Sequence, residues 1–242
     1  MNLTEYRRTS ARLSDYLPWA ALVGPGVVLN KDGSFQRTAK FRGPDLDSAV
    51  AAELVGVAAR LNNSFRRLGS GWAIFVEAQR SEAGTYPNDV FPDAASALVD
   101  AERKADFEQE GSHFVSGYFL TFLWLPPAEG AARSVSWLYE GRETSGVNPW
   151  ELVRGFIDRT DRVLALLDGF MPECSWLDDA GTLTYLHSTI STNRHRVRVP
   201  EVPMYLDALL ADQPLTGGLE PRLGLSHLRV LTITGFPGAT TP

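Results

Sequence analysis

The sequence predicts an α+β fold with a mixed or antiparallel sheet and helices packed against it. Three observations support this class. Short apolar runs rich in aromatic and β-branched residues alternate with stretches of helical periodicity, and an Asp-Gly pair supplies hairpin turn chemistry. In addition, 44% of the 242 residues are hydrophobic, which is enough to build a sizeable core.

The first regular element is expected to be a β-hairpin. Residues 1–18 are interpreted as a lead-in with Tyr16 as an aromatic anchor, and Trp19 follows it directly. A strand begins at residue 27, and residues 30–33 form the turn because Gly33 tolerates a positive φ. The return strand then places four alternating residues on one face: Phe35, Arg37, Ala39 and Phe41.

A helix is predicted over 45–68, where apolar residues recur at spacings of three and four and Asp45 or Asp47 is available as a cap. A strand over 71–80 follows. The next helix, 93–110, has a thin apolar side and is expected at the surface. The aromatic run 113–127 is the strongest strand candidate and is expected to be central in the sheet.

The second half is predicted to be mainly helical. The expected elements, in order, are a short helix over 131–139, helices over 149–170 and 179–191, an extended stretch over 192–203, a short helix over 204–211 and a last strand over 227–236. The resulting order, ββαβ, α, β, α, α, β, contains ferredoxin-like ββαβ and αβ elements.

The domain organisation follows from these elements. We expect a lead-in over 1–18 and one α+β domain over 19–236, with a division into two sublobes near 127–148 as an alternative. Gly and Pro residues over 237–242 indicate the start of a linker.

Composition narrows the function. A net charge of −6 argues against a protein that coats nucleic acid. The lone Cys174 fits a reducing compartment and is interpreted as an inert thiol. No signal peptide is visible, and the apolar stretches are too short to span a bilayer.

A search for catalytic motifs finds none. A P-loop needs Lys followed by Ser or Thr, but the lysines Lys31, Lys40 and Lys104 precede other residue types. The stretch LALLDG at 164–169 imitates a Walker B strand but lies in a helical pattern. No spacing typical of metal ligation or serine catalysis occurs. An unrecognised enzymatic site, with His187 beside Asp178, remains an alternative.

One positive feature is an arginine row, Arg194, Arg196 and Arg198, which alternates with His195, Val197 and Val199. As a strand, this stretch presents an arginine face and an apolar face. The row fits a nucleic-acid ligand, an acidic protein partner or a solvated edge strand, and the solvated edge is favoured because charged edges prevent aggregation.

Long stretches of the chain resemble the N-terminal portion of TrbE-type conjugal transfer proteins, in the CagE/TrbE/VirB family of type IV secretion system ATPases. The stretches that carry this resemblance are PWAALVGPGVVLNKDGSFQRTAKFRGPDLDS, LNNSFRRLGSGWAIFVEAQR, GFMPECSWLDDAGTLTYLHSTIST, RVRVPEVPMYLDALLADQPLTGGLEPRLG and HLRVLTITGFPGATTP.

The resemblance implies a cytoplasmic motor in which ATP and Mg²⁺ bind a C-terminal domain that carries the Walker motifs. It implies that this chain has no cofactor or metal and no enzymatic activity of its own. Its role would be an adaptor to the inner-membrane complex, peripherally attached through partner proteins, in a protein that forms homo-oligomers. Tyr16, Trp19, the arginine row and the helix over 93–110 are the predicted partner contacts.

Overall fold

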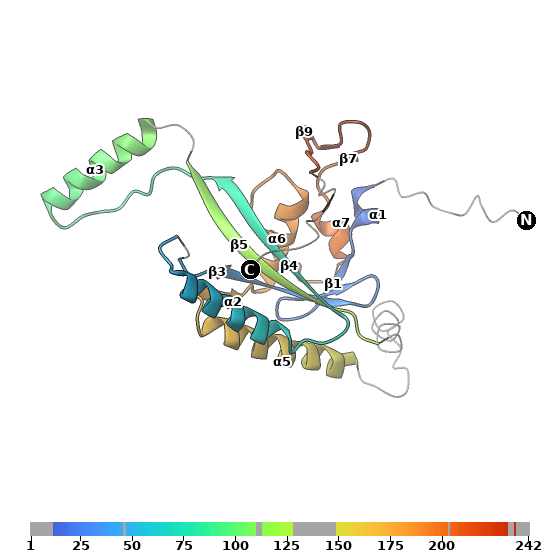
Figure 1. The fold of residues 1–242 in the computed structure, drawn as a ribbon. Helices are drawn as coiled ribbons and strands as arrows, with labels where there is room; N and C mark the ends of the chain where they lie inside the picture. Colours follow the sequence, from blue (N-terminus) through green and yellow to red (C-terminus); the bar gives the residue numbers. More distant parts are fainter. Residues whose placement is uncertain are drawn as a thin grey trace, which may run out of the picture. The chain divides into compact units, whose positions relative to one another are not determined.

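The computed structural model of the chain describes residues 12–45, 47–109, 113–127, 149–202, 204–231 and 235. It divides into two compact units (Figure 1). Unit 1 comprises Met1–Arg37, Leu123–Asp158 and Leu177–Pro242, and unit 2 comprises Thr38–Phe122 and Arg159–Trp176. The main strands are hydrogen-bonded in the order β1-β2-β3-β5-β4, and β6 pairs with β3. The predicted α+β class, with helices packed on an antiparallel sheet, is confirmed.

The predicted hairpin is present in unit 1. β2 (Val27–Asn30) pairs antiparallel with the start of β3 (Phe35–Arg42), and Val28 lies opposite Gln36. Gly33 has a φ of 84°, as the turn requires. The buried Asn30 side chain donates from Nδ2 to Ser34 Oγ at 3.0 Å, which fixes the two ends of the turn together.

A strand that the sequence reasoning did not predict precedes this hairpin. β1 (Trp19–Gly24) pairs antiparallel with β2, from Trp19 opposite Asn30 to Gly24 opposite Val27. The short helix α1 (Leu13–Tyr16) lies before it, so the expected lead-in is ordered from residue 12. Pro18 and the GPG stretch at 24–26 made a five-residue apolar run look like a loop, although strands of this length are common.

The core of unit 1 lies between these strands and helices. α5 (Pro149–Asp168) contributes Phe156, whose ring lies 5.9 Å from that of Phe35 and 6.4 Å from that of Trp124. α6 (Asp179–Ile190) begins at Asp178, whose side chain accepts a hydrogen bond from the Gly181 amide at 2.6 Å. α7 (Leu206–Leu210) packs on β1 and on α6.

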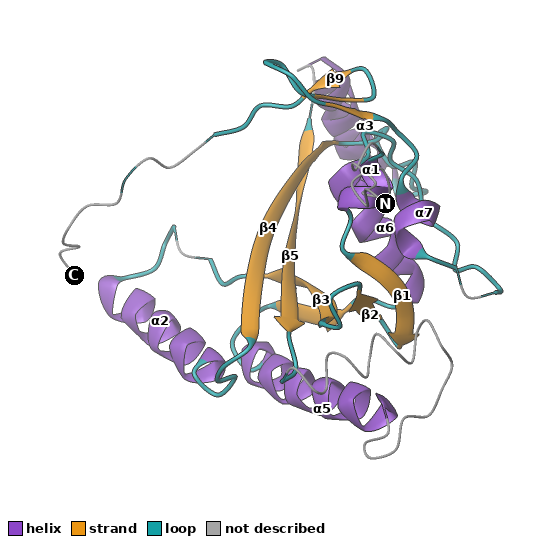
Figure 2. Cartoon of the chain, turned by 90° about the vertical axis from the view of Figure 1, so that its right-hand side faces the viewer, coloured by secondary structure: helices purple, strands orange, loops and turns teal. Residues whose placement is uncertain are grey.

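Unit 2 has its own apolar core. The strand β5 (Phe114–Trp124) contributes Leu120 and Phe122, and α5 contributes Val163 and Leu167. β5 lies between β3 and β4 (Trp72–Glu82), so its predicted central position is confirmed. Figure 2 shows β4 and β5 as long neighbouring strands. The strand β6 (Glu173–Trp176), which was not predicted, pairs with β3 antiparallel.

Helix α2 (Ala51–Phe65) is shorter than predicted. Neither Asp45 nor Asp47 caps it, so that prediction is wrong. Instead the Val50 amide donates to the Glu53 carboxylate at 3.1 Å, which satisfies the first amide without an Asp cap. Asp45 is used one turn earlier, where its carboxylate accepts from the Asp47 amide.

Helix α3 (Ala94–Gln109) matches the predicted surface helix, and none of its residues is buried. The expected strand over 227–236 is wrong over its described part. Regular structure ends with β9 (Ser226–His227), which pairs with β8 (Arg222–Leu223), itself paired with β7 (Leu215–Thr216). Residues 228–231 belong to no strand. The helix over 131–139 and the linker over 237–242 lie outside the described residues.

Candidate functional site

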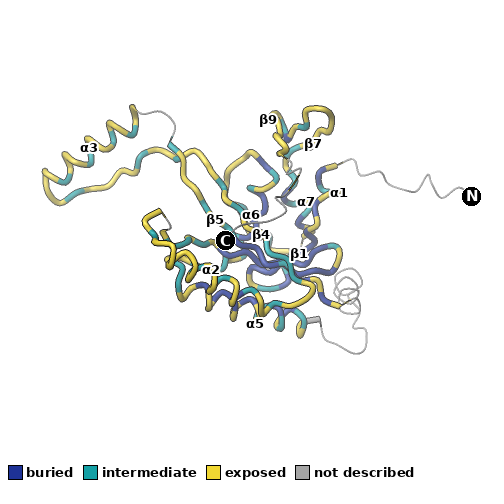
Figure 3. Tube along the Cα trace, in the orientation of Figure 1, coloured by how far each residue is buried: buried dark blue, intermediate teal, exposed yellow. Residues whose placement is uncertain are grey.

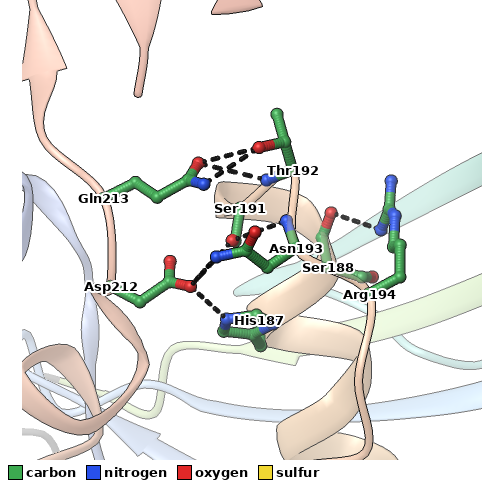
Figure 4. A network of polar contacts seen from close by, with 8 residues as sticks. All are labelled: His187, Ser188, Ser191, Thr192, Asn193, Arg194, Asp212 and Gln213. Atoms are coloured by element: carbon green, nitrogen blue, oxygen red, sulfur yellow. Dashed lines mark hydrogen bonds and ion pairs between the residues drawn. The ribbon is translucent and has the colours of Figure 1, made fainter. Parts of the chain in front are cut away.

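A polar network joins the last turn of α6 to the segment after α7 in unit 1 (Figure 4). Asp212 Oδ2 accepts from Asn193 Nδ2 at 2.8 Å and from Ser191 Oγ at 3.1 Å. His187 Nε2 lies 3.2 Å from the same oxygen, but off line, so this contact is electrostatic rather than a well-formed hydrogen bond. Gln213 Oε1 accepts from the amide of Thr192. The network fastens the chain that follows α6.

The network stabilises the charged form of Asp212. Partial burial would raise the Asp212 pKa, but hydrogen bonds from Asn193 and Ser191 and the neighbouring His187 outweigh it, and the pKa lies below its usual value. The carboxylate therefore contributes stability above the pKa of an unfolded Asp, and that contribution is lost as the pH falls through the lower folded pKa.

We expect Asp212→Asn to lower the free energy of unfolding by about 1 kcal/mol at neutral pH, because it removes a charge-assisted acceptor. The difference from the parent chain should shrink as the pH falls below the ordinary Asp range, where the parent carboxylate is protonated as well. Urea unfolding at several pH values measures it, with Asp89→Asn at an exposed position as the control. A difference that is independent of pH would contradict this assignment.

The arginine row does not form the predicted strand. Residues 193–200 have no sheet partner, and Val199 is 42% exposed, so no buried apolar face stands opposite the arginines. The segment is held by side chains instead. The Val197 amide donates to Thr184 Oγ1 at 3.0 Å, and Arg194 Nη1 donates to the Ser188 carbonyl at 2.9 Å. Arg194, Arg196 and Arg198 are all exposed.

The two predicted aromatic contacts differ in exposure. The Tyr16 side chain is 62% exposed, whereas that of Trp19 is 7% exposed and belongs to the core of unit 1. Trp19 therefore offers little surface to a partner. A partner-binding role for Tyr16, Trp19 and the three arginines stays a prediction.

The alternative catalytic pairing of His187 with Asp178 is not formed. The two residues lie at opposite ends of α6, roughly 13 Å apart along its axis, and Asp178 serves as the N-cap. His187 neighbours Asp212 and the ring of His195, at 4.5 Å between ring centroids. A cavity of about 440 Å³ lies nearby, and it is lined by Arg12, Leu13, Ser14, Ala208, Ala211, Asp212, Gln213, Pro214 and Leu215.

Other reactive groups supply no chemistry. Burial, followed by the charge of Asp168, raises the pKa of the Cys174 thiol to about 11, which keeps it protonated and weakly nucleophilic at neutral pH. Among the described residues, no three His, Cys, Asp or Glu side chains gather as a metal site would require. Over the same residues, no helix has the length and apolar character to cross a membrane.

Sequence reasoning missed Asp212 and Gln213. They follow α7 directly, and their partners lie about twenty residues earlier, so no local pattern marks them. Only the fold brings them to the end of α6. The polar run Ser191–Thr192–Asn193 was the one available signal, because such residues favour side-chain contacts beyond a helix end.

Fold and site together define a class: an α+β domain whose described residues offer charged and apolar surface rather than a catalytic cluster. Residues 26–132 match the family model described as type IV secretion system ATPase VirB4/TrbE, N-terminal domain. The chain is 41% identical over 127 residues to a probable conjugal transfer protein TrbE of Sinorhizobium fredii (strain NBRC 101917 / NGR234), covering 51% of the chain and 85% of that relative. The chain belongs to the VirB4/TrbE family of type IV secretion ATPases, as the N-terminal domain.

A second relative covers nearly the whole chain. The "Conjugal transfer protein TrbE" of Rhizobium radiobacter is 32% identical over 258 aligned positions, which include 99% of this chain. The chain spans 31% of that relative's length. The resemblance stated from the sequence is thereby confirmed.

Proposed function

We propose that this chain is a non-catalytic adaptor domain that links a cytoplasmic ATPase motor to the inner-membrane complex of a type IV secretion system during DNA or protein transfer. The observation that carries this proposal is the match of 99% of the chain to less than a third of a conjugal transfer protein, in the portion that the family model describes as the N-terminal domain of an ATPase.

The chemistry of the chain supports this division of labour. The sequence contains no Lys-Ser or Lys-Thr pair, so a P-loop cannot be formed within these 242 residues. In this proposal ATP and Mg²⁺ bind elsewhere in the longer protein, and the chain transmits motion. The exposed helix α3 and the exposed arginines are surfaces that such a role would use.

The proposed partners are the inner-membrane and other cytoplasmic components of the secretion system, which would hold the chain at the cytoplasmic side of the membrane. Co-purification tests this. The tagged chain is expressed with each inner-membrane component of its own system, and at least one component should be retained after washing. If none is retained by the chain while the longer protein retains one, the adaptor role lies outside these residues.

The catalytic aspect of the proposal has its own measurement. The highly purified chain should show no Mg²⁺-dependent release of phosphate from ATP above a buffer blank. Turnover that co-elutes with the chain through successive columns would contradict a purely mechanical role.

A further inference from the structure

Helix α3 is the least buried regular element of unit 2. None of its residues is buried, and the side chains of Leu98 and Val99 are 63% and 49% exposed. Figure 3 shows the helix without a buried segment along its length. A helix of this length is only marginally stable in water unless one face is packed. Its outward face is therefore a surface that a partner would stabilise.

The inner side of α3 is already occupied. Asp100 accepts a hydrogen bond from Tyr86 Oη at 2.7 Å, and Lys104 Nζ lies 3.2 Å from Asn88 Oδ1. Phe107 stacks on the ring of His113 at 4.0 Å between centroids. These contacts hold α3 against the loop that precedes it and determine which side remains outward.

The outward side of α3 combines apolar and acidic groups. Leu98 and Val99 lie one turn from Glu102, and Asp106 follows one turn later, so these four exposed residues form a continuous stripe. A partner that matches the stripe needs an apolar floor with cations beside it.

A groove of this chemistry exists in unit 2. It has a volume of about 300 Å³, and it is lined by Arg67, Leu68, Arg159, Arg162, Val163 and Leu166. Val163 belongs to the core and Leu68 packs against it, so the floor is apolar and fixed. The three arginines are exposed at its rim. Guanidinium groups bind carboxylates through paired hydrogen bonds, which makes such a rim selective for acidic ligands.

We propose that α3 of one copy of this chain docks in the Arg67–Arg159–Arg162 groove of a second copy. Leu98 and Val99 cover the floor, and Glu102 and Asp106 face the arginines. The net charge of −6 opposes non-specific association of copies, so a stable contact needs local complementarity of this kind. Because the two surfaces differ, the contact is head-to-tail and repeats from copy to copy. This inference does not depend on the proposed adaptor role.

Sedimentation velocity over a range of protein concentrations, at low and at high salt, tests the proposal. The parent chain should self-associate, and the association should weaken as salt screens the carboxylate–arginine pairs. The variant Glu102→Arg/Asp106→Arg should associate at least about tenfold more weakly. Both substitutions lie at exposed positions of a helix without buried residues, so the fold is retained, as circular dichroism would verify.

A charge-swap mixture provides the decisive measurement. The α3 variant mixed with Arg159→Glu/Arg162→Glu should form a complex that neither variant forms alone. Matched charge reversals at exposed positions, Glu201→Arg and Arg229→Glu, should leave the association of the parent chain unchanged. A chain that remains monomeric at low salt, or an association unaffected by reversing Glu102 and Asp106, would overturn the proposal.

Discussion

Phe156→Ala is expected to lower the free energy of unfolding by about 3–5 kcal/mol, because it empties the centre of an aromatic stack. The side chain is fully buried, and its ring contacts those of Phe35 and Trp124. A typical domain has a total stability of roughly 5–15 kcal/mol, so this single change removes a large share. Urea unfolding followed by tryptophan fluorescence measures the loss.

The matched control for that experiment is Phe75→Ala. Its side chain is 55% exposed on β4, so the same truncation should change stability by no more than about 0.5 kcal/mol. If Phe156→Ala costs no more than Phe75→Ala, the stack described for unit 1 is wrong.

Gly26→Ala is expected to cost about 2–3 kcal/mol, because the position is strained for any residue with a Cβ. Gly26 has a φ of 65°, and an added Cβ would lie 2.4 Å from the Leu177 carbonyl oxygen. The Gly26 amide also donates to Asp179 Oδ1 at 2.7 Å, so moving the backbone away would break the link between the β1–β2 turn and α6.

Gly56→Ala is the control with the opposite sign. Gly56 lies in α2, and an added Cβ would meet no atom within 4 Å. Alanine there should stabilise the chain by roughly 0.5–1 kcal/mol through helix propensity. Both variants restrict the unfolded chain equally, so thermal or urea unfolding of the pair isolates the native-state strain at Gly26. Equal effects at the two positions would contradict the strained turn.

The elements predicted well from the sequence are those whose evidence is local and repeated. The hairpin at β2 and β3, the strand β5 and the helices α3, α5 and α6 each carry periodicity or turn chemistry over many residues. β1 and β6 were missed because each is a short apolar run beside Gly or Pro, and only its neighbouring strand makes it a strand.

The candidate site followed the same pattern. Arg194, Arg196 and Arg198 were visible in the sequence, but their alternation suggested a strand, whereas side-chain hydrogen bonds from Thr184 and Ser188 hold that segment outside any sheet. The contacts of His187 with Asp212 depend on where α7 ends, which no sequence window contains. The arginine groove likewise joins residues about ninety positions apart.

The pairing of β3 with β6 imposes an order on folding during synthesis. Ala39 lies opposite Trp176, and Phe41 lies opposite Cys174, so the two strands come from distant parts of the chain. Closing so long a loop costs conformational entropy before any contact repays it. As the ribosome produces the chain from its N-terminus, that flank of β3 must wait until β6 has emerged. Until then its backbone amides and carbonyls are open to chaperones or to another nascent chain.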